Sequence, residues 1–146
     1  MREVALTAGR VWPPESLCMS DGRQAFGQIA ESEAERYLRR KGYRILARND
    51  RSSNGELDLV AQLADTLVFI EVKARRTSAF GGVAHAVDGR KQTRLVRLAA
   101  EYLARHRVRN RSCRFDVVLC RGGTAKPVEI EHIENAFEVP GEDLRW

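Results

Sequence analysis

Apolar residues recur at helical spacing in two stretches of the chain. The first predicts a helix over residues 24–41, which ends before Gly42, a residue typical of a helix C-cap. The second predicts a helix from an N-cap at Asp88 to about residue 106. Each helix has one apolar stripe for a core, formed by Ile29, Ala30, Ala34, Tyr37 and Leu38 in the first and by Leu95, Leu98, Ala99, Tyr102 and Leu103 in the second.

Five β-rich runs complete the regular pattern. They cover residues 44–49, 55–63, 66–74, 114–120 and 128–133. Asn54-Gly55 is a strong turn signal between the first two runs, and Ala64-Asp65 leaves only a short loop before the third, so these three runs predict an antiparallel meander. The order α-β-β-β-α-β-β predicts one α/β domain with a mixed sheet flanked by helices.

The two ends of the chain lack this periodicity. Residues 1–22 contain Pro13-Pro14 and end in a loop-like run from Met19 to Gly22, so we expect a disordered N-terminal arm. The domain is predicted over residues 23–138, followed by a tail over 139–146. Because Met19 directly precedes the first predicted helix, a translation start at Met19 instead of Met1 is an open alternative.

The short loop between the second and third strands sets their register. With either two or four loop residues, Asp58 lies directly opposite Glu71, and Glu56 lies opposite Lys73. Alternation places these four charged side chains on one face, and Leu57, Leu59, Ala61, Val68, Ile70 and Val72 on the other. Since Leu67 and Phe69 are apolar on the charged face, we expect a sheet partly buried on both faces, with a polar corner.

Two carboxylates directly opposite one another repel, and a divalent cation with oxygen ligands relieves the repulsion. We therefore expect Asp58 and Glu71 to bind Mg²⁺ or Mn²⁺, the cations of phosphate chemistry. Lys73 would then stabilise negative charge that develops beside the metal. The alternative is structural: Lys73 pairs with Glu56 across an exposed face and has no chemical role. Glu56 is expected to support Lys73 in either case and not to bind the metal.

The charge of the chain is concentrated in one stretch. Its 25 Lys and Arg and 20 Asp and Glu give a net charge of +5, but residues 75–111 alone carry ten basic and two acidic residues. Because this stretch follows the strand with Glu71 and Lys73, we expect contacts with the DNA phosphate backbone from Arg75, Arg76, Arg90, Lys91 and Arg94. The alternative is a solvated helix face without a partner.

Cysteines and histidines follow no metal-binding pattern. The three cysteines, at positions 18, 113 and 120, have no CxxC spacing, which indicates a reduced, cytoplasmic protein. His85, His106 and His132 are far apart in the sequence, and each is expected at a helix end or on the surface. Asp116 is expected to support the site or to form a buried ion pair. The apolar runs are far shorter than the roughly 20 residues of a membrane span.

Several motifs occur along the chain in a characteristic order. They are Gly27-x-x-x-Glu31-x-x-Ala34-x-x-Tyr37-Leu38, the run from Gly42 to Asn49, the run from Gly55 to Ala61, Phe69-Ile70-Glu71-Val72-Lys73, Lys91-Gln92, the run from Arg114 to Val118, and the run from His132 to Phe137. Together they resemble the YraN family of uncharacterised bacterial proteins. That family is similar to the PD-(D/E)xK nucleases of the restriction-endonuclease-like fold, especially archaeal Holliday-junction resolvases, whose core is α-β-β-β-α-β.

The resemblance implies a role for each matching residue. Asp58 and Glu71 would be the metal ligands, Lys73 the catalytic lysine, Glu31 the acid carried by the first helix, and Gln92 a polar residue of the site on the second helix. Glu35 lies one turn from Glu31 and could reach the sheet instead; both acids could also be solvated, and Gln92 could be a surface residue. Leu57 stands where the nucleases often have proline, at a place where resolvase-like members vary.

These observations predict a metal-dependent nuclease or nucleic-acid-processing protein that acts on DNA, branched or structured DNA included. The reaction implied is Mg²⁺-dependent cleavage of a phosphodiester bond. Two alternatives remain open. One is a non-catalytic nucleic-acid-binding protein of the same fold, and the other is a structural or interaction module whose charged corner forms salt bridges. If the resemblance to junction resolvases extends to assembly, the protein is a homodimer.

Overall fold

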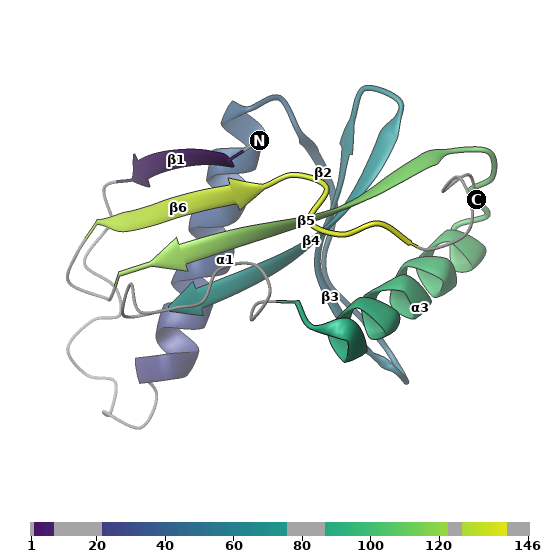
Figure 1. Ribbon diagram of the computed structural model, residues 1–146, viewed down its shortest axis with the longest axis horizontal. Helices are drawn as coiled ribbons and strands as arrows, with labels where there is room; N and C mark the ends of the chain where they lie inside the picture. Colours follow the sequence, from purple (N-terminus) through teal and green to yellow (C-terminus); the bar gives the residue numbers. More distant parts are fainter. Residues whose placement is uncertain (1, 8–21, 76–86, 123–126, 140–146) are drawn as a thin grey trace.

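The computed structural model describes residues 2–7, 22–75, 87–122 and 127–139. In chain order these residues form β1 (Arg2–Thr7), α1 (Gly22–Arg40), β2 (Arg44–Ser52), β3 (Gly55–Leu63), β4 (Thr66–Arg75), α3 (Gly89–Arg105), β5 (Ser112–Arg121) and β6 (Val128–Ile133). The strands make one six-stranded sheet in the order β1-β6-β5-β4-β3-β2 (Figure 1). β4 and β5 run parallel, and the other neighbours run antiparallel. The predicted mixed α/β domain is confirmed.

Local sequence signals fix the ends of both helices. At the end of α1, the N–H of Tyr43 donates to the carbonyl of Leu38 and the N–H of Gly42 donates to that of Arg39, both at 3.0 Å. This pattern is a Schellman motif, and Gly42 adopts the left-handed φ of +93° that the motif requires. At the start of α3, the Asp88 side chain accepts a hydrogen bond from the N–H of Lys91 at 2.9 Å. Neither described helix is long and apolar enough to cross a membrane.

The sheet is buried on both faces, because α1 and α3 pack on opposite sides of it. On the α3 side, Leu98 packs in one cluster with Phe69 and Phe115 of the central strands. On the α1 side, Leu38 packs in a second cluster with Ile70 and other sheet residues. The apolar stripe predicted for each helix supplies these contacts. The expectation of burial on both faces is confirmed.

One predicted side-chain orientation was wrong. Leu57 was placed on the same face as Leu59, but Leu57 belongs to the α3-side cluster and Leu59 to the α1-side cluster. The alternation is interrupted between them at Asp58. On the neighbouring strand, Asn49 stands between the two residues paired with Leu57 and Leu59 and adopts a left-handed φ of +48°. A kink at this point moves the two leucines to opposite faces.

The N-terminal residues also differ from the prediction. Arg2–Thr7 form the edge strand β1, in which Arg2 pairs with Ile133 and Thr7 pairs with Val128 of β6. The expectation of a disordered arm was wrong for these residues. Backbone N–H and C=O groups hold an edge strand to its neighbour, so a short one needs no periodic side-chain pattern. Residues 8–21, with Met19, lie outside the described residues, as do residues 140–146 of the predicted tail.

Candidate functional site

β3 and β4 separate where the charged residues begin. Their ladder runs from the pair Leu63–Thr66 to the pair Leu59–Ile70, in the predicted register, and ends there. Asp58 and Glu71 are the next residue on each strand. Beyond the ladder, the Oδ2 atom of Asp58 accepts a hydrogen bond of 2.8 Å from the backbone N–H of Val72. Asp58 and Glu71 therefore lie next to each other, as predicted, at the fork where the two strands separate.

Asp58 and Glu71 form a crowded pair of carboxyl groups. Glu71 is 6% exposed. Burial raises the pKa of Asp58 to about 7, the negative charge of Glu71 adds to the rise, and the hydrogen bond from Val72 opposes it. A side-chain hydrogen bond joins Asp58 to Glu71 and acts in the same upward direction. Near neutral pH Asp58 is therefore partly protonated, because burial and the negative charge of Glu71 both disfavour its ionised form.

Lys73 is the cation that lies against this pair. Its Nζ atom is 2.7 Å from Oε1 of Glu71, and both side chains are largely buried. Lys73 was predicted opposite Glu56, with Glu56 as its partner, and that pairing was wrong. The β3–β4 ladder has ended before these positions, whereas Glu71 and Lys73 stand two residues apart on one strand and share a face.

Glu56 instead belongs to a group that joins β2, β3 and α1. In the orientation that turns its nitrogen toward the acids, the Asn49 amide donates to Oε1 of Glu56 at 2.7 Å and to Oε2 of Glu31 at 3.2 Å. Arg51 donates to the other oxygen of Glu56 at 3.1 Å. Asn49 was missed from the sequence. The signal available was its residue type, since asparagine is one of the few residues that readily adopt a left-handed φ.

The structure distinguishes Glu31 from Glu35, the two acids one turn apart on α1. Glu35 forms ion pairs with Arg39 of the same helix and with Arg48 of β2, and its side chain is 14% exposed. Glu31 faces the site: burial raises its pKa, Asn49 opposes the rise, and the negative charges of Glu56 and Glu71 add to it. Glu31 is thus the acid of α1 that lies near Glu56 and Glu71, whereas Glu35 reaches the sheet at Arg48, and a role for Glu31 in the site stays a prediction.

Basic residues of α3 lie beside this group of acids. Burial and the charge of Lys73 lower the pKa of Lys91, while Glu71 raises it, so Lys91 is within electrostatic reach of both site residues. Arg90 and Arg94 are exposed on the same helix. Arg75 ends β4 and donates to the carbonyl of Ala74 at 2.9 Å. Arg76, the remaining residue predicted to contact nucleic acid, lies outside the described residues.

Gln92 has a local partner. Its Nε2 atom donates to the carbonyl of Val87 at 3.1 Å, which ties the first turn of α3 to the residue before its N-cap. In the described part of the chain, no hydrogen bond joins Gln92 to Asp58, Glu71 or Lys73. Its predicted place in the site therefore remains a prediction.

A divalent cation fits part of this arrangement. The donor set is carboxylate oxygen, which Mg²⁺ and Mn²⁺ prefer. The raised pKa of Asp58 reflects burial first and then the repulsion from Glu71, which a cation would relieve. Among the described residues, however, no three His, Cys, Asp or Glu side chains come together as a metal-ligand group. The fit is thus to a two-carboxylate site, with the remaining positions left to water and phosphate.

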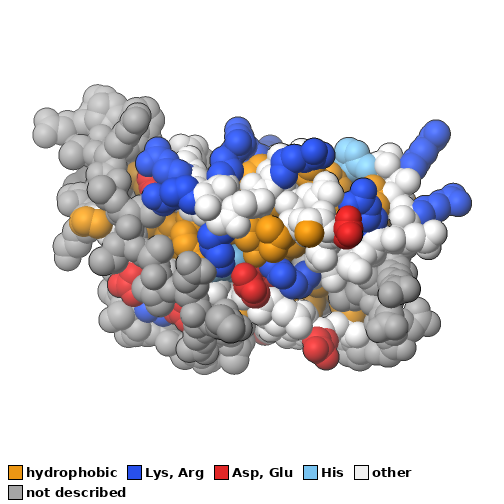
Figure 2. Space-filling view, turned by 90° about the horizontal axis from the view of Figure 1, so that it is seen from above, with side chains coloured by type: hydrophobic (Ala, Val, Ile, Leu, Met, Phe, Trp, Pro, Cys, Tyr) orange, Lys and Arg blue, Asp and Glu red, His pale blue; other side chains and the backbone are white. Residues whose placement is uncertain are grey.

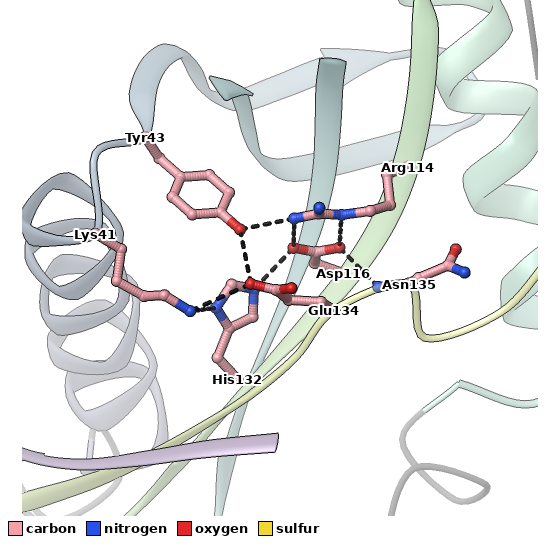
Figure 3. A network of polar contacts seen from close by, with 7 residues as sticks. All are labelled: Lys41, Tyr43, Arg114, Asp116, His132, Glu134 and Asn135. Carbon is pink, nitrogen blue, oxygen red and sulfur yellow. Dashed lines mark hydrogen bonds and ion pairs between the residues drawn. The ribbon is translucent and has the colours of Figure 1, made fainter. Parts of the chain in front are cut away.

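A second polar cluster lies on the α1 side of the sheet, around Asp116 (Figure 3). The Arg114 guanidinium contacts both carboxylate oxygens of Asp116 at 2.8 Å. His132 and the backbone N–H of Asn135 also contact them, at 2.7 Å and 3.0 Å. Burial raises the pKa of Asp116, but these hydrogen bonds outweigh it and hold the pKa below its usual range. Asp116 thus forms the buried ion pair that was one of its two predicted roles.

His132 is the residue of this cluster that sequence reasoning placed wrongly. It was expected on the surface or at a helix end, but it is fully buried. Lys41 lies 3.1 Å from its Nδ1 atom, and Asp116 lies 2.7 Å from Nε2. Because an ammonium group can only donate, Nδ1 accepts, and the neutral ring donates through Nε2 to Asp116. His106 does lie at a helix end, as the C-cap of α3. His85 lies outside the described residues.

The Asp116 cluster links three elements. Arg114 and Asp116 stand on β5, His132 stands on β6, and Lys41 follows α1, so the contacts tie the end of that helix to two strands (Figure 3). Tyr43 adds contacts to Arg114 at 2.6 Å and to Glu134 at 3.3 Å. The donors and acceptors of these contacts are paired with one another within the protein. This pairing indicates a structural role for the Asp116 cluster.

Comparison with known proteins places the chain in a family. The model of the "Uncharacterised protein family UPF0102" matches residues 30–120. A UPF0102 protein of Frankia casuarinae is 46% identical over 115 residues, which are 79% of this chain and 98% of that protein. One from Pelotomaculum thermopropionicum is 44% identical over 122 residues, 82% of this chain and all of that protein. One from Moorella thermoacetica is 50% identical over 100 residues, 68% of this chain and 83% of that protein.

Among solved structures, SfsA of Pyrococcus furiosus in complex with Ca²⁺ resembles this chain weakly. The TM-score is 0.32 at 14% sequence identity, covering 80% of this chain and 65% of that one. The family match covers the strands and helices that carry Asp58, Glu71, Lys73 and Glu31. On the family model and these relatives, the chain belongs to UPF0102, the YraN family.

Proposed function

We propose that this protein is a metal-dependent nuclease that hydrolyses phosphodiester bonds in DNA, branched or structured DNA included. One observation carries the proposal: two carboxyl groups, Asp58 and Glu71, meet at the fork between two strands, with the Lys73 ammonium against one of them. A protein gains no stability from buried carboxyl groups in such proximity. Clusters of this kind, with a strongly shifted pKa, are typical of functional sites.

Asp58 and Glu71 would hold Mg²⁺ or Mn²⁺ in the proposed site, with Glu31 close by on α1. When bound, the metal supplies a Lewis acid for the phosphate and an activated water. Asp58 contributes by releasing its proton, which leaves a carboxylate oxygen for the cation beside Glu71. Asn49 contributes by holding Glu31 and Glu56 in place.

Lys73 has the position of a charge stabiliser. Glu71 holds the ammonium group, and the Lys73 side chain is largely buried. The position of the positive charge is therefore fixed before any substrate binds. A charge held in place in this way stabilises negative charge on the phosphate without a reorganisation step. Lys91 on α3 extends the positive potential on the same side, since it lies within electrostatic reach of both Lys73 and Glu71.

The exposed face of α3 would hold the DNA backbone next to the site. Arg90 and Arg94 are one turn apart, exposed, and in no ion pair with a described residue. By contrast, the other half of α3 carries an acid of its own, Glu101, near Arg105, and Arg105 pairs with Asp50. The unpaired positive charge of α3 is therefore on the half nearest the acids, where phosphate contacts would orient a substrate.

Cleavage assays on duplex, single-stranded and four-way DNA with Mg²⁺ or Mn²⁺ test this proposal. The wild type should cleave at least one substrate, and Asp58→Asn, Glu71→Gln and Lys73→Met should each lower the rate by 100-fold or more. Glu35→Gln is the matched control, because Glu35 lies one turn from Glu31 but is paired with Arg39 and Arg48 instead of the acids of the site. A wild type that cleaves none of the substrates, or a Lys73→Met variant with undiminished cleavage, would overturn the proposal.

A second candidate is a non-catalytic nucleic-acid-binding protein of the same fold. It is favoured by the Lys73–Glu71 ion pair, which satisfies both groups without a metal, and by the lack of a three-ligand group among the described residues. This candidate predicts salt-dependent DNA binding, no cleavage, and no gain in melting temperature with Mn²⁺. A structural module would bind no DNA at all in the same experiment.

A further inference from the structure

The fold divides the basic stretch of the sequence between two places. Of its described residues, Arg75 ends β4, and Arg90, Lys91, Arg94 and Arg97 lie on the first half of α3, the half nearer the acids. Arg107, Arg109 and Arg111 come after α3 has ended, in the connection to β5. α3 runs from Gly89 to Arg105, about 25 Å at 1.5 Å per residue, and it carries this second group away from the site.

The α3–β5 connection lies at the same end of the sheet as the α1–β2 connection. Arg44 at the start of β2 pairs with Gln62, Gln62 pairs with Leu67, and Leu67 pairs with Cys113 at the start of β5. These residues form one row across four strands, about 14 Å wide at the usual strand spacing. Arg40 and Arg44 therefore join the later arginines at one sheet end, although more than sixty residues separate the two groups in the sequence.

We call this surface the arginine end. Its members are Arg40, Arg44, Arg107, Arg109 and Arg111. Figure 2 views this end of the molecule and shows Lys and Arg side chains spread across the described surface, with few acids between them. Within the described ranges, no acidic side chain forms an ion pair with any of the five. Arg39, Arg48 and Arg105 differ in this respect, since Glu35 and Asp50 neutralise them.

We propose that the arginine end binds the phosphate backbone of the nucleic acid whose phosphodiester bond lies at the Asp58–Glu71 site. This inference rests on the proposed function and extends it to a second contact surface. A guanidinium group matches the geometry of a phosphate and can donate to two of its oxygens at once. Five such groups, none of them paired with an acid of the described ranges, make a surface that gains most from a polyanion, because each contact also releases counterions.

The distance between the two surfaces sets the length of the substrate. Thr66, at the arginine end of β4, and Glu71 are five residues apart on one strand, which is about 17 Å. A duplex rises 3.4 Å per base pair, so it must extend at least about five base pairs from the scissile bond to touch both surfaces. The substrate class is thus a nucleic acid with a helical arm on that side, and a mononucleotide or dinucleotide reaches only the acids.

Binding measurements test this inference independently of cleavage. A fluorescein-labelled 30-base-pair duplex is titrated in EDTA at several salt concentrations with wild type, with the triple variant Arg107→Gln, Arg109→Gln, Arg111→Gln, and with the matched triple Arg39→Gln, Arg48→Gln, Arg105→Gln. Both triples lose the same charge. The first should weaken binding tenfold or more and reduce the slope of log K against log salt by roughly two to three units, at about 0.9 per lost contact. The matched triple should keep nearly the wild-type slope.

A second variant, Arg40→Gln with Arg44→Gln, probes the other half of the arginine end and should reduce the slope by roughly one to two units. Equal losses in the two triples, or unchanged slopes in both arginine-end variants, would overturn the inference. So would a loss of binding to anionic phospholipid vesicles with unchanged DNA binding, since the partner would then be a membrane. Arginine-dependent binding by a wild type that cleaves no DNA would keep this inference and remove the nuclease.

Discussion

The carboxylate of Asp58 binds the backbone N–H of Val72 at the point where β3 and β4 part. The backbones of β3 and β4 are no longer paired at Val72, so the Asp58 side chain accepts the hydrogen bond from this β4 donor. This contact holds the carboxyl group in the plane of the fork and next to Glu71. The fork therefore creates both the space for a site and the crowding of its acids.

Asp58→Asn should stabilise the protein without metal, most clearly at high pH. Asp58 keeps its proton up to a pKa of about 7 in the folded protein, against 3.8 ordinarily. The folded state thus holds a proton that the unfolded chain has lost, and stability falls as pH rises through this window. Asparagine stays neutral and can still accept from Val72. Urea unfolding should show a gain on the order of 2 kcal/mol at pH 8 and almost none at pH 4.

Asp50→Asn is the control for this effect. Asp50 is an acid of β2 that is neutralised by Arg105 near the surface, so its loss should lower stability by no more than about 1 kcal/mol. An Asp58→Asn variant that is less stable than wild type at pH 8 would show that Asp58 forms a favourable contact, contrary to the repulsion argued here.

The affinity for metal should rise with pH and then level off. A cation at Asp58 and Glu71 competes with the proton on Asp58, and that proton is lost near pH 7. Between pH 5.5 and 6.5 the apparent Mn²⁺ affinity should increase about tenfold, with little further change above pH 8. Calorimetric titration at several pH values measures it. An affinity independent of pH over this range would place the cation elsewhere, as would full binding by Glu71→Gln.

Asp116→Asn should destabilise the protein far more than any change at the acids of the fork. The substitution leaves the half-buried Arg114 without its bidentate partner and weakens the contacts from His132 and Asn135. Breaking one side of a buried ion pair costs about 3 to 5 kcal/mol. Glu134→Gln, at the more exposed rim of the same cluster, should cost about 1 kcal/mol or less. Chemical unfolding of both variants at pH 7 gives the comparison, and similar costs would contradict it.

Periodicity was enough to predict most of the fold. The stripe on α3 is the set of residues buried there, because an amphipathic helix has only one way to cover a sheet. Val128–Ile133 form β6 with the predicted bounds. The sequence failed where the backbone departs from regular geometry. The kink at Asn49 moves Leu57 to the other face, and no alternation rule anticipates a left-handed residue inside a strand.

The site was predicted only as far as the strand register extends. Two residues, Asp58 and Glu71, follow from the Ala64-Asp65 loop, and the observed ladder keeps that register. The partner of Lys73 did not follow, because pairing rules hold only while strands stay paired. The Asp116–His132 contact joins residues on two strands through their side chains, and neither residue carries a local sign of it.

Two glycines, Gly27 inside α1 and Gly42 just after its end, offer a test of what ends that helix. Gly42 has a left-handed φ of +93°, with no atom within 4 Å of an added Cβ, so Gly42→Ala should cost about 1 kcal/mol from backbone strain alone. Gly27 lies inside the helix with ordinary backbone angles and equally open space, so Gly27→Ala should add up to about 1 kcal/mol of stability. Urea unfolding of the two variants measures the contrast. Since an added Cβ meets no further atom within 4 Å at either position, packing does not account for opposite signs. A Gly42→Ala variant as stable as wild type, or more stable, would show that the Schellman motif does not depend on glycine.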